Sequence, residues 1–335
     1  MRLFIIFCVL TCLMMVSESS DFVDPDTPVN PYYKNYKLVF SDEFNEKNIN
    51  QRKWNLGINS QNIQNTTVVC LYDWKNITCR NGELIFTQRK EVPLVHGKIW
   101  GKSTVPFSYS SGGINTTKDF KFTNYMYVEL RVKLPNNPGG YAAFWGMANN
   151  LSLPVKDQIE LDFYEFVANP DKQKMWSGLW WHEYEINEIK SGIIPQDIMK
   201  RPNNSIFMKN QSRRAHYQPD VERKLSRINF DDYITFGFRV DDKVMEWFIT
   251  EEGSPLDNKP FMTFHGGQVY SSAYEAGDYI DDKWIRNIPN PLHSNLIINY
   301  AMRDTAWAGG PIDDEALPSS MKVDYIRVYS FKENK

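Results

Sequence analysis

The sequence predicts an all-β fold, a sandwich of antiparallel strands. Segments rich in β-branched and aromatic residues recur along the 335-residue chain, with turn residues between them. Amphipathic helical periodicity is scarce, and aromatic residues make up 14% of the chain. Many short strands separated by turns are typical of an antiparallel sandwich. The aromatic content suits a β core, and it also suits a protein that stacks rings on flat sugar faces.

The strand pattern begins after a polar, Pro-rich lead-in at residues 20–35, which we expect to be loose. The clearest strand is YMYVELRVKL at 125–134, where apolar and polar residues alternate. Its apolar residues, which we expect to face the core, are Met126, Val128, Leu130, Val132 and Leu134. Further strands are predicted at 38–44, 82–89, 140–148, 158–168, 174–182, 233–240, 243–249, 294–301 and 321–330. Residues 183–228 show little periodicity, so we expect a long insertion at the rim of one domain at 36–332.

The N-terminus indicates an exported protein, and the net charge excludes one class of partner. Arg2 precedes an apolar run from Leu3 to Val16, and small polar residues follow, so residues 1–19 have the layout of a secretory signal. The run is too short to span a bilayer, and no later segment is apolar enough. The net charge of −3 argues against nucleic-acid binding. We therefore expect a secreted, extracellular monomer with no membrane or nucleic-acid partner.

Cysteine and asparagine usage fits that compartment. Cys8 and Cys12 would leave with the signal, and Cys70 and Cys79 then form an even pair in an oxidising route. A disulfide between these two is predicted, with two buried thiols as the alternative. Glycosylation is predicted at six Asn-x-Ser/Thr triplets, at Asn65, Asn76, Asn115, Asn150, Asn203 and Asn210.

The segment QIELDFYEF at 158–166 carries three carboxylates on a predicted strand. Side chains alternate with period two, so Glu160 and Asp162 share a face and Glu165 would point the other way. The intervening residues are apolar or aromatic, which argues against an exposed loop. A β-bulge between Asp162 and Glu165 would reset the alternation and bring all three acids onto one face.

Two carboxylates on one face of a sheet can cleave a glycosidic bond. At a separation of about 5–5.5 Å one of them attacks the anomeric carbon directly, as in retaining enzymes. We expect Glu160 to be the nucleophile and Glu165 the general acid/base. The charge of Asp162 opposes ionisation of its neighbours, so at least one carboxyl should be protonated near neutral pH. The alternative is three structural acids paired with Lys and Arg.

At these residues the sequence resembles glycoside hydrolase family sixteen. ELDFYE at 160–165 fits its Glu-x-Asp-x-x-Glu signature, and the longer, bulged spacing is similar to that of its laminarinase, agarase and carrageenase branches. Segments 38–46, 111–145 and 296–331 resemble the family's opening, central and closing strands. The resemblance implies a β-jelly-roll of two curved antiparallel sheets with an open substrate cleft.

The resemblance also implies roles for single residues. Glu160, Asp162 and Glu165 match the nucleophile, the assisting acid and the acid/base. Trp145 matches the family's cleft tryptophan, which stacks on a sugar ring. Further candidates for substrate binding are Trp180, His182 and Trp307. Plain core packing for Trp145 and a structural role for His182 are the alternatives. No cofactor is required; a structural calcium ion is possible at Glu43 and Asp324, because hard oxygen ligands suit that ion.

Departures from the family pattern leave the substrate open. Members often have Trp-Pro before the signature and Gly before its first Glu, but this chain has Leu153 before Pro154 and Ile159 before Glu160. We predict a retaining endo-glycosidase acting on a β-glucan polysaccharide, with β-1,3-glucan first, mixed-linkage glucan second, and sulfated galactans disfavoured by the negative net charge. The alternatives are a non-catalytic β-glucan recognition protein, a transglycosylase, an agarase- or carrageenase-like galactanase, and a structural wall protein.

Overall fold

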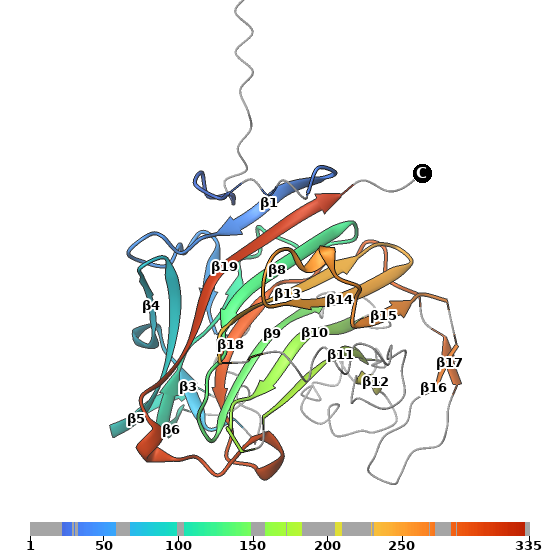
Figure 1. Ribbon diagram of the computed structural model, residues 1–335. Helices are drawn as coiled ribbons and strands as arrows, with labels where there is room; N and C mark the ends of the chain where they lie inside the picture. Colours follow the sequence, from blue (N-terminus) through green and yellow to red (C-terminus); the bar gives the residue numbers. More distant parts are fainter. Residues whose placement is uncertain are drawn as a thin grey trace, which may run out of the picture.

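The structure is a computed structural model. Two β-sheets and the core between them make up most of it (Figure 1). It describes residues 22–28, 30, 33–57, 68–98, 104–148, 158–171, 173–182, 205–209, 229, 231–267, 269–271, 283–285 and 287–331. The predicted signal at 1–19 lies outside these residues. No helix in the described part is long and apolar enough to cross a membrane.

The larger sheet has ten strands. Their order is β15-β14-β13-β8-β19-β5-β6-β3, with β1 also pairing with β19 and β4 with β5. The bounds are β1 (Tyr36–Asp42), β3 (Cys70–Tyr72), β4 (Ile77–Arg80), β5 (Glu83–Lys98), β6 (Thr104–Ser111), β8 (Met126–Lys133), β13 (Tyr233–Val240), β14 (Val244–Thr250), β15 (Met262–His265) and β19 (Ser319–Phe331). The pair β3–β6 is parallel, and the other pairs are antiparallel.

The smaller sheet has seven strands, all paired antiparallel, in the order β12-β11-β10-β9-β18-β7-β2. They are β2 (Trp54–Leu56), β7 (Gly113–Thr116), β9 (Gly140–Ala148), β10 (Gln158–Val167), β11 (Lys174–His182), β12 (Ser205–Lys209) and β18 (Ile297–Met302). A separate pair joins β16 (Val269–Ser271) to β17 (Lys283–Ile285). Short 3-10 turns are η1 (Trp74–Asn76), η4 (Pro255–Asp257), η5 (Ala306–Ala308) and η6 (Asp314–Ala316).

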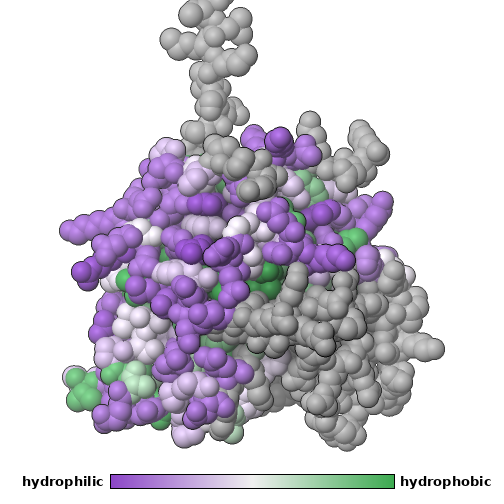
Figure 2. All heavy atoms as spheres, in the orientation of Figure 1, coloured by the Kyte–Doolittle hydropathy of each residue, from purple (hydrophilic) through white to green (hydrophobic). Residues whose placement is uncertain are grey.

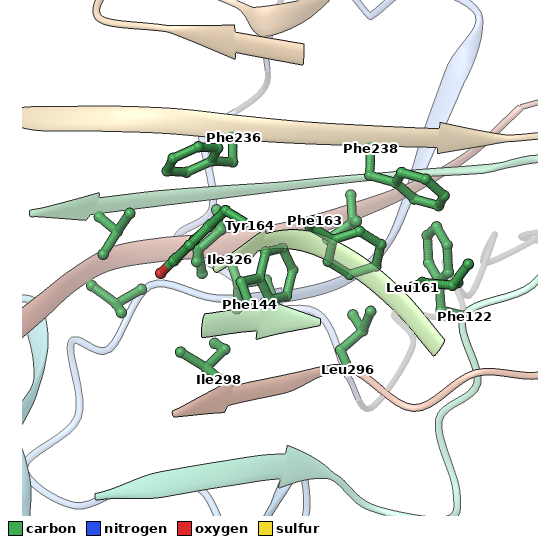
Figure 3. Close-up of a cluster of buried hydrophobic side chains, with 14 of the residues drawn as sticks. Phe122, Phe144, Leu161, Phe163, Tyr164, Phe236, Phe238, Leu296, Ile298 and Ile326 are labelled. Atoms are coloured by element: carbon green, nitrogen blue, oxygen red, sulfur yellow. The ribbon is translucent and has the colours of Figure 1, made fainter. Parts of the chain in front are cut away.

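The core lies between the two sheets and is rich in aromatic side chains. Figure 3 shows Phe144 and Ile298 of the smaller sheet together with Phe236, Phe238 and Ile326 of the larger sheet. The alternation predicted for β8 is confirmed, because its apolar residues belong to or pack against this core. In Figure 2 the described surface on the face shown is mainly hydrophilic. Among the described residues the exposed large apolar side chains are Val92, Leu94 and Trp307.

All ten predicted strands are present, most of them within two or three residues of the predicted bounds. The strand predicted at 82–89 is longer, because β5 continues to Lys98. Nine strands were not predicted, namely the eight-residue β6 and the shorter β2, β3, β4, β7, β12, β15, β16 and β17. One of them, β12, falls in the predicted insertion 183–228 and pairs with β11 at the sheet edge; the rest of that insertion lies outside the described residues.

The end of the lead-in is not loose. Tyr33 is buried, and its ring packs against the ring of Tyr329 with the centroids 4.6 Å apart. Its hydroxyl donates to Oε2 of Glu129 at 2.5 Å, a carboxylate on the face of β8 that points away from the core. The prediction missed this contact because a short polar segment carries no periodic signal.

The predicted disulfide is wrong. Cys70 and Cys79 are both thiols, and they lie on strands with different partners, because β3 pairs with β6 and β4 with β5. The Sγ atom of Cys70 accepts a hydrogen bond from the backbone N–H of Met302 at 3.3 Å. Burial raises the pKa of both thiols to about 12, so the thiol form is retained at neutral pH.

Two of the predicted glycosylation sites are buried. The Nδ2 atom of Asn76 donates to Ser110 Oγ at 2.7 Å, and that of Asn115 donates to the carbonyl of Gly57 at 2.6 Å. Because a glycan is attached to this nitrogen, neither side chain fits a glycan in the folded chain. The other four asparagines, Asn65, Asn150, Asn203 and Asn210, lie outside the described residues.

Candidate active site

Strand β10 carries the predicted β-bulge. Its register against β11 shifts between Asp162 and Glu165, and its register against β9 shifts between Asp162 and Tyr164. Phe163 and Tyr164 are consecutive residues, and both are buried in the core. The core side of β10 therefore holds residues 159, 161, 163, 164 and 166, which leaves Glu160, Asp162 and Glu165 on the opposite face. We call these three residues the acid row.

Hydrogen bonds from both sheets satisfy the backbone at the bulge. The carbonyl of Asp162 accepts from Nε1 of Trp247, a fully buried residue on β14 of the larger sheet, at 3.0 Å. The carbonyl of Phe163 accepts from Oγ of Ser177 on β11 at 2.7 Å. A buried backbone carbonyl without a partner is costly, so these two bonds stabilise the bulged conformation.

Strand β9 lines one side of the acid row. The Cα atoms of Trp145 and Ala143 are register partners of Asp162 and Glu165. Trp145 is half-buried, and its Nε1 atom donates to Oδ1 of Asn299 on β18 at 2.7 Å. This bond fixes the orientation of the indole ring on the face that holds the acids.

Tyr141 also lies on this side of β9, and its hydroxyl donates to Oε1 of Glu165 at 2.6 Å. Burial and then the charge of Glu165 raise the pKa of Tyr141 well above its ordinary value, although the charge of Arg303 acts in the opposite direction. The phenol therefore remains a hydrogen-bond donor to Glu165 over the working pH range.

Aromatic rings gather beside Glu165. The ring of Tyr141 lies 6.4 Å from that of Trp176 and 6.0 Å from that of Trp307, centroid to centroid. Trp307, in η5, is 49% exposed. The guanidinium of Arg303 lies 4.3 Å from the Tyr141 ring and 5.2 Å from the Trp307 ring. We call Tyr141, Trp176 and Trp307 the aromatic cluster.

The structure brings together five of the predicted site residues, namely the acid row, Trp145 and Trp307. Two others are placed by backbone register alone. The Cα partner of Trp180 is Glu160, and that of His182 is Gln158. The side chains of Trp180 and His182 lie outside the described residues.

The two residues considered for calcium are used otherwise. Arg327 forms a two-pronged ion pair with Glu43, with Nε–Oε1 at 2.8 Å and Nη2–Oε2 at 2.7 Å. Nη1 of Arg131 lies 2.6 Å from Oδ2 of Asp324. Calcium needs six to eight oxygen ligands, and no group of three or more candidate metal ligands is found in the described part of the chain. The residues present do not fit the ion.

Four residues of the site were not predicted: Tyr141, Trp176, Asn299 and Arg303. A signal existed for Tyr141, because it lies four residues before Trp145 and period two puts both on one face of β9. Asn299 contacts Trp145 and Arg303 contacts Tyr141, and each of these partners lies more than 100 residues away in sequence, so no local pattern could reveal the two contacts.

A β-sandwich with three carboxylates and an exposed tryptophan on one sheet face has the groups expected of a glycoside hydrolase. The family model described as "Glycosyl hydrolases family 16" matches residues 64–200. This match covers less than half of the chain, and it agrees with the resemblance found in the sequence.

Relatives and solved structures are similar to this chain over most of its length. Glucan endo-1,3-beta-glucosidase A1 of Niallia circulans is 24% identical over 330 residues, which are 94% of this chain and 40% of that protein. The chain thus spans less than half the length of that relative. The laminarinase catalytic domain of Thermotoga petrophila RKU-1 superposes with a TM-score of 0.57 at 22% identity, covering 89% of this chain and 99% of that one.

A structure from human gut bacteria that express endo-acting O-glycanases to initiate mucin breakdown has a TM-score of 0.63 at 21% identity. It covers 91% of this chain and 95% of its own. At these identities the structural likenesses show the fold alone. The predicted β-jelly-roll is confirmed.

Proposed function

We propose that the chain is a secreted, retaining endo-glycosidase that hydrolyses internal bonds of a β-1,3-glucan, with mixed-linkage β-1,3-1,4-glucan as the next substrate. One observation carries the chemistry. The bulge between Asp162 and Glu165 brings a third carboxylate onto the face that already holds Glu160 and Asp162. A strand without this irregularity would send Glu165 into the core.

The proposed reaction has two steps. A carboxylate oxygen of Glu160 attacks the anomeric carbon while Glu165 gives its proton to the departing glycosidic oxygen, so the C–O bond breaks and a glycosyl ester forms. Glu165 then takes a proton from water, whose oxygen attacks the same carbon and releases Glu160. Two inversions leave the anomeric configuration unchanged.

Asp162 lies between the two glutamates in the row, and its side chain is 3% exposed. A negative charge this well buried opposes a second charge nearby, which favours the protonated form of a neighbouring carboxyl. The free enzyme needs that form of Glu165 before the first step.

The substrate assignment rests on the aromatic rings and on the relatives. Trp145 and Trp307 each present ring surface on or beside the acid row, and flat sugar faces stack on such rings. The names of the relative from Niallia circulans and of the Thermotoga petrophila structure both specify 1,3-β-glucan. The fold similarity to O-glycanases makes a mucin glycoprotein a necessary member of any substrate panel.

The test is reducing-sugar release from laminarin, barley mixed-linkage glucan, agarose, carrageenan and mucin. The matched control is Glu160→Gln, which keeps size and hydrogen bonding but removes the nucleophile. We expect release from laminarin that is absent in the variant. If laminarin binds but no substrate is cleaved, the chain is a recognition protein instead. Residual activity in Glu160→Gln at more than about a hundredth of the original rate would contradict the nucleophile assignment.

The role of Glu165 has its own test. Glu165→Ala should lose most activity on polysaccharide, where the leaving oxygen needs a proton, and much less on an aryl glycoside with a good leaving group. Equal losses on both substrates would exclude a proton-donating role. Product analysis with added acceptor oligosaccharide separates hydrolysis from transglycosylation.

A further inference from the structure

The hydroxyl of Tyr141 contacts the proposed acid/base directly, and the mechanism above does not use it. It donates to Oε1 of Glu165 at 2.6 Å, a short bond for an O–H donor and a carboxyl acceptor. Tyr141 is buried on β9, where its Cα partner is Val167, two residues beyond Glu165 on β10. Sheet register and burial therefore hold the hydroxyl at this oxygen.

The ring of Tyr141 is fixed on several sides. Trp176 and Trp307 contribute ring contacts at 6.4 and 6.0 Å between centroids, and the Arg303 guanidinium lies 4.3 Å from the Tyr141 ring centroid. A cation over the ring draws electron density from the phenol, which makes its hydroxyl a stronger donor. These contacts hold the Tyr141 ring, and with it the hydroxyl, in one orientation.

We propose that Tyr141 is a positioning residue for Glu165. Its hydroxyl occupies Oε1, so that Oε2 carries the proton that goes to the glycosidic oxygen in the first step and that is taken from water in the second. The inference rests on the proposed function and adds a residue to it. No additional reactant is required, because the Tyr141 proton is not transferred.

The hydrogen bond also sets the ease with which Glu165 gives up its proton. A donor to a carboxylate favours the charged form, and so does the positive charge of Arg303, whereas Glu160 and Asp162 on the same face of β10 favour the neutral form. Removing the Tyr141 hydroxyl shifts this balance toward the neutral form. The pKa of Glu165 should then rise, and its proton should be harder to transfer.

The experiment is the pH dependence of kcat/KM on laminarin for the wild type and for Tyr141→Phe. Phe keeps the ring contacts and removes only the hydroxyl. Because the first step needs protonated Glu165, we expect the alkaline limb of the profile to move up by about one pH unit. We also expect kcat to fall about tenfold on laminarin, and less on an aryl glycoside with a good leaving group.

Tyr33→Phe is the matched control. Tyr33 donates to Glu129 at 2.5 Å, so this variant also loses a buried tyrosine-to-carboxylate bond, but on the other sheet. It should lose stability and keep the wild-type pH profile. A second probe replaces Tyr141 by difluorotyrosine, which is close in shape and a stronger donor, and should move the alkaline limb down.

The outcomes separate two failures. If the wild type cleaves no member of the panel, the proposed function falls and this inference falls with it. If the wild type is active and depends on Glu160, an unmoved alkaline limb in both Tyr141 variants overturns the positioning role alone. Should Tyr141→Phe fail to fold, the difluorotyrosine variant decides, because a purely structural role would leave its profile unchanged.

Discussion

Asp42, at the end of β1, should make the stability of the protein fall as the pH rises. Its side chain is buried, and it accepts hydrogen bonds from Trp54 Nε1 at 2.7 Å and from the backbone N–H of Phe44 at 3.0 Å. Burial raises the pKa of Asp42 from 3.8 to about 6, even though Lys53 and these two donors act in the opposite direction. The carboxyl is therefore protonated in the folded chain at a pH where the unfolded chain has already lost that proton.

The sign follows from proton binding. Above pH 3.8 the folded state binds more protons at this site than the unfolded state, so unfolding becomes easier as the pH rises. The favourable contribution is fully present below the unfolded pKa and is lost as the pH passes about 6. At about 1.4 kcal/mol per pKa unit, the complete loss is about 3 kcal/mol.

Replacing Asp42 by Asn removes the titration. An amide oxygen can still accept from Trp54 or Phe44, and any bond that is lost gives an offset that does not depend on pH. Between about pH 4.5 and about pH 7, the unfolding free energy of Asp42→Asn minus that of the wild type should rise by about 2 kcal/mol. Urea unfolding at a series of pH values measures it. Parallel curves for the two proteins would refute a raised pKa at Asp42.

Two further variants test the supports of the site. Gly309 has a φ of +86°, and a Cβ there would lie 2.6 Å from Cγ1 of Val167. Gly309→Ala should therefore lower the free energy of unfolding in urea by about 2–3 kcal/mol, and it should raise KM because it shifts Trp307. An unchanged midpoint of urea unfolding would contradict the strain. Asn299→Ala removes the acceptor for Trp145 Nε1, so KM for laminarin should rise several-fold with kcat nearly unchanged, because the indole loses a fixed orientation and not a reacting group. A fall in kcat alone would point instead to a disturbed acid row.

The long strands could be predicted because each buries one face against the same core. In β8 the residues Val128, Leu130 and Val132 are all fully buried, and their period of two is visible without any partner. The strands that were missed are mostly three to five residues long, too short for a period to show. Their conformation depends on pairing with distant segments, as when β3 joins β6 in parallel.

The candidate site divides in the same way. The acid row could be found because its three acids lie within six residues, and the odd spacing itself indicated the bulge. The bond from Tyr141 to Glu165 joins the neighbouring strands β9 and β10, and the bond from Trp145 to Asn299 joins residues 154 positions apart. Such partners depend on strand order, which one sequence does not reveal. The disulfide prediction failed for a related reason, since cysteine parity says nothing about which strands adjoin.

The bulge ties the chemistry of the site to the packing of the core. One extra residue turns both Phe163 and Tyr164 inward, and each finds a ring on the larger sheet, with Phe163 4.6 Å from Phe238 and Tyr164 4.3 Å from Phe236, centroid to centroid. Trp247, on that same sheet, donates to the Asp162 carbonyl at the point where the register shifts. Because core contacts hold two consecutive side chains inside, Glu165 must lie on the outer face. The position of the proposed acid/base is thus set by apolar packing behind it, and a core change that let Tyr164 turn outward would carry Glu165 away from Glu160.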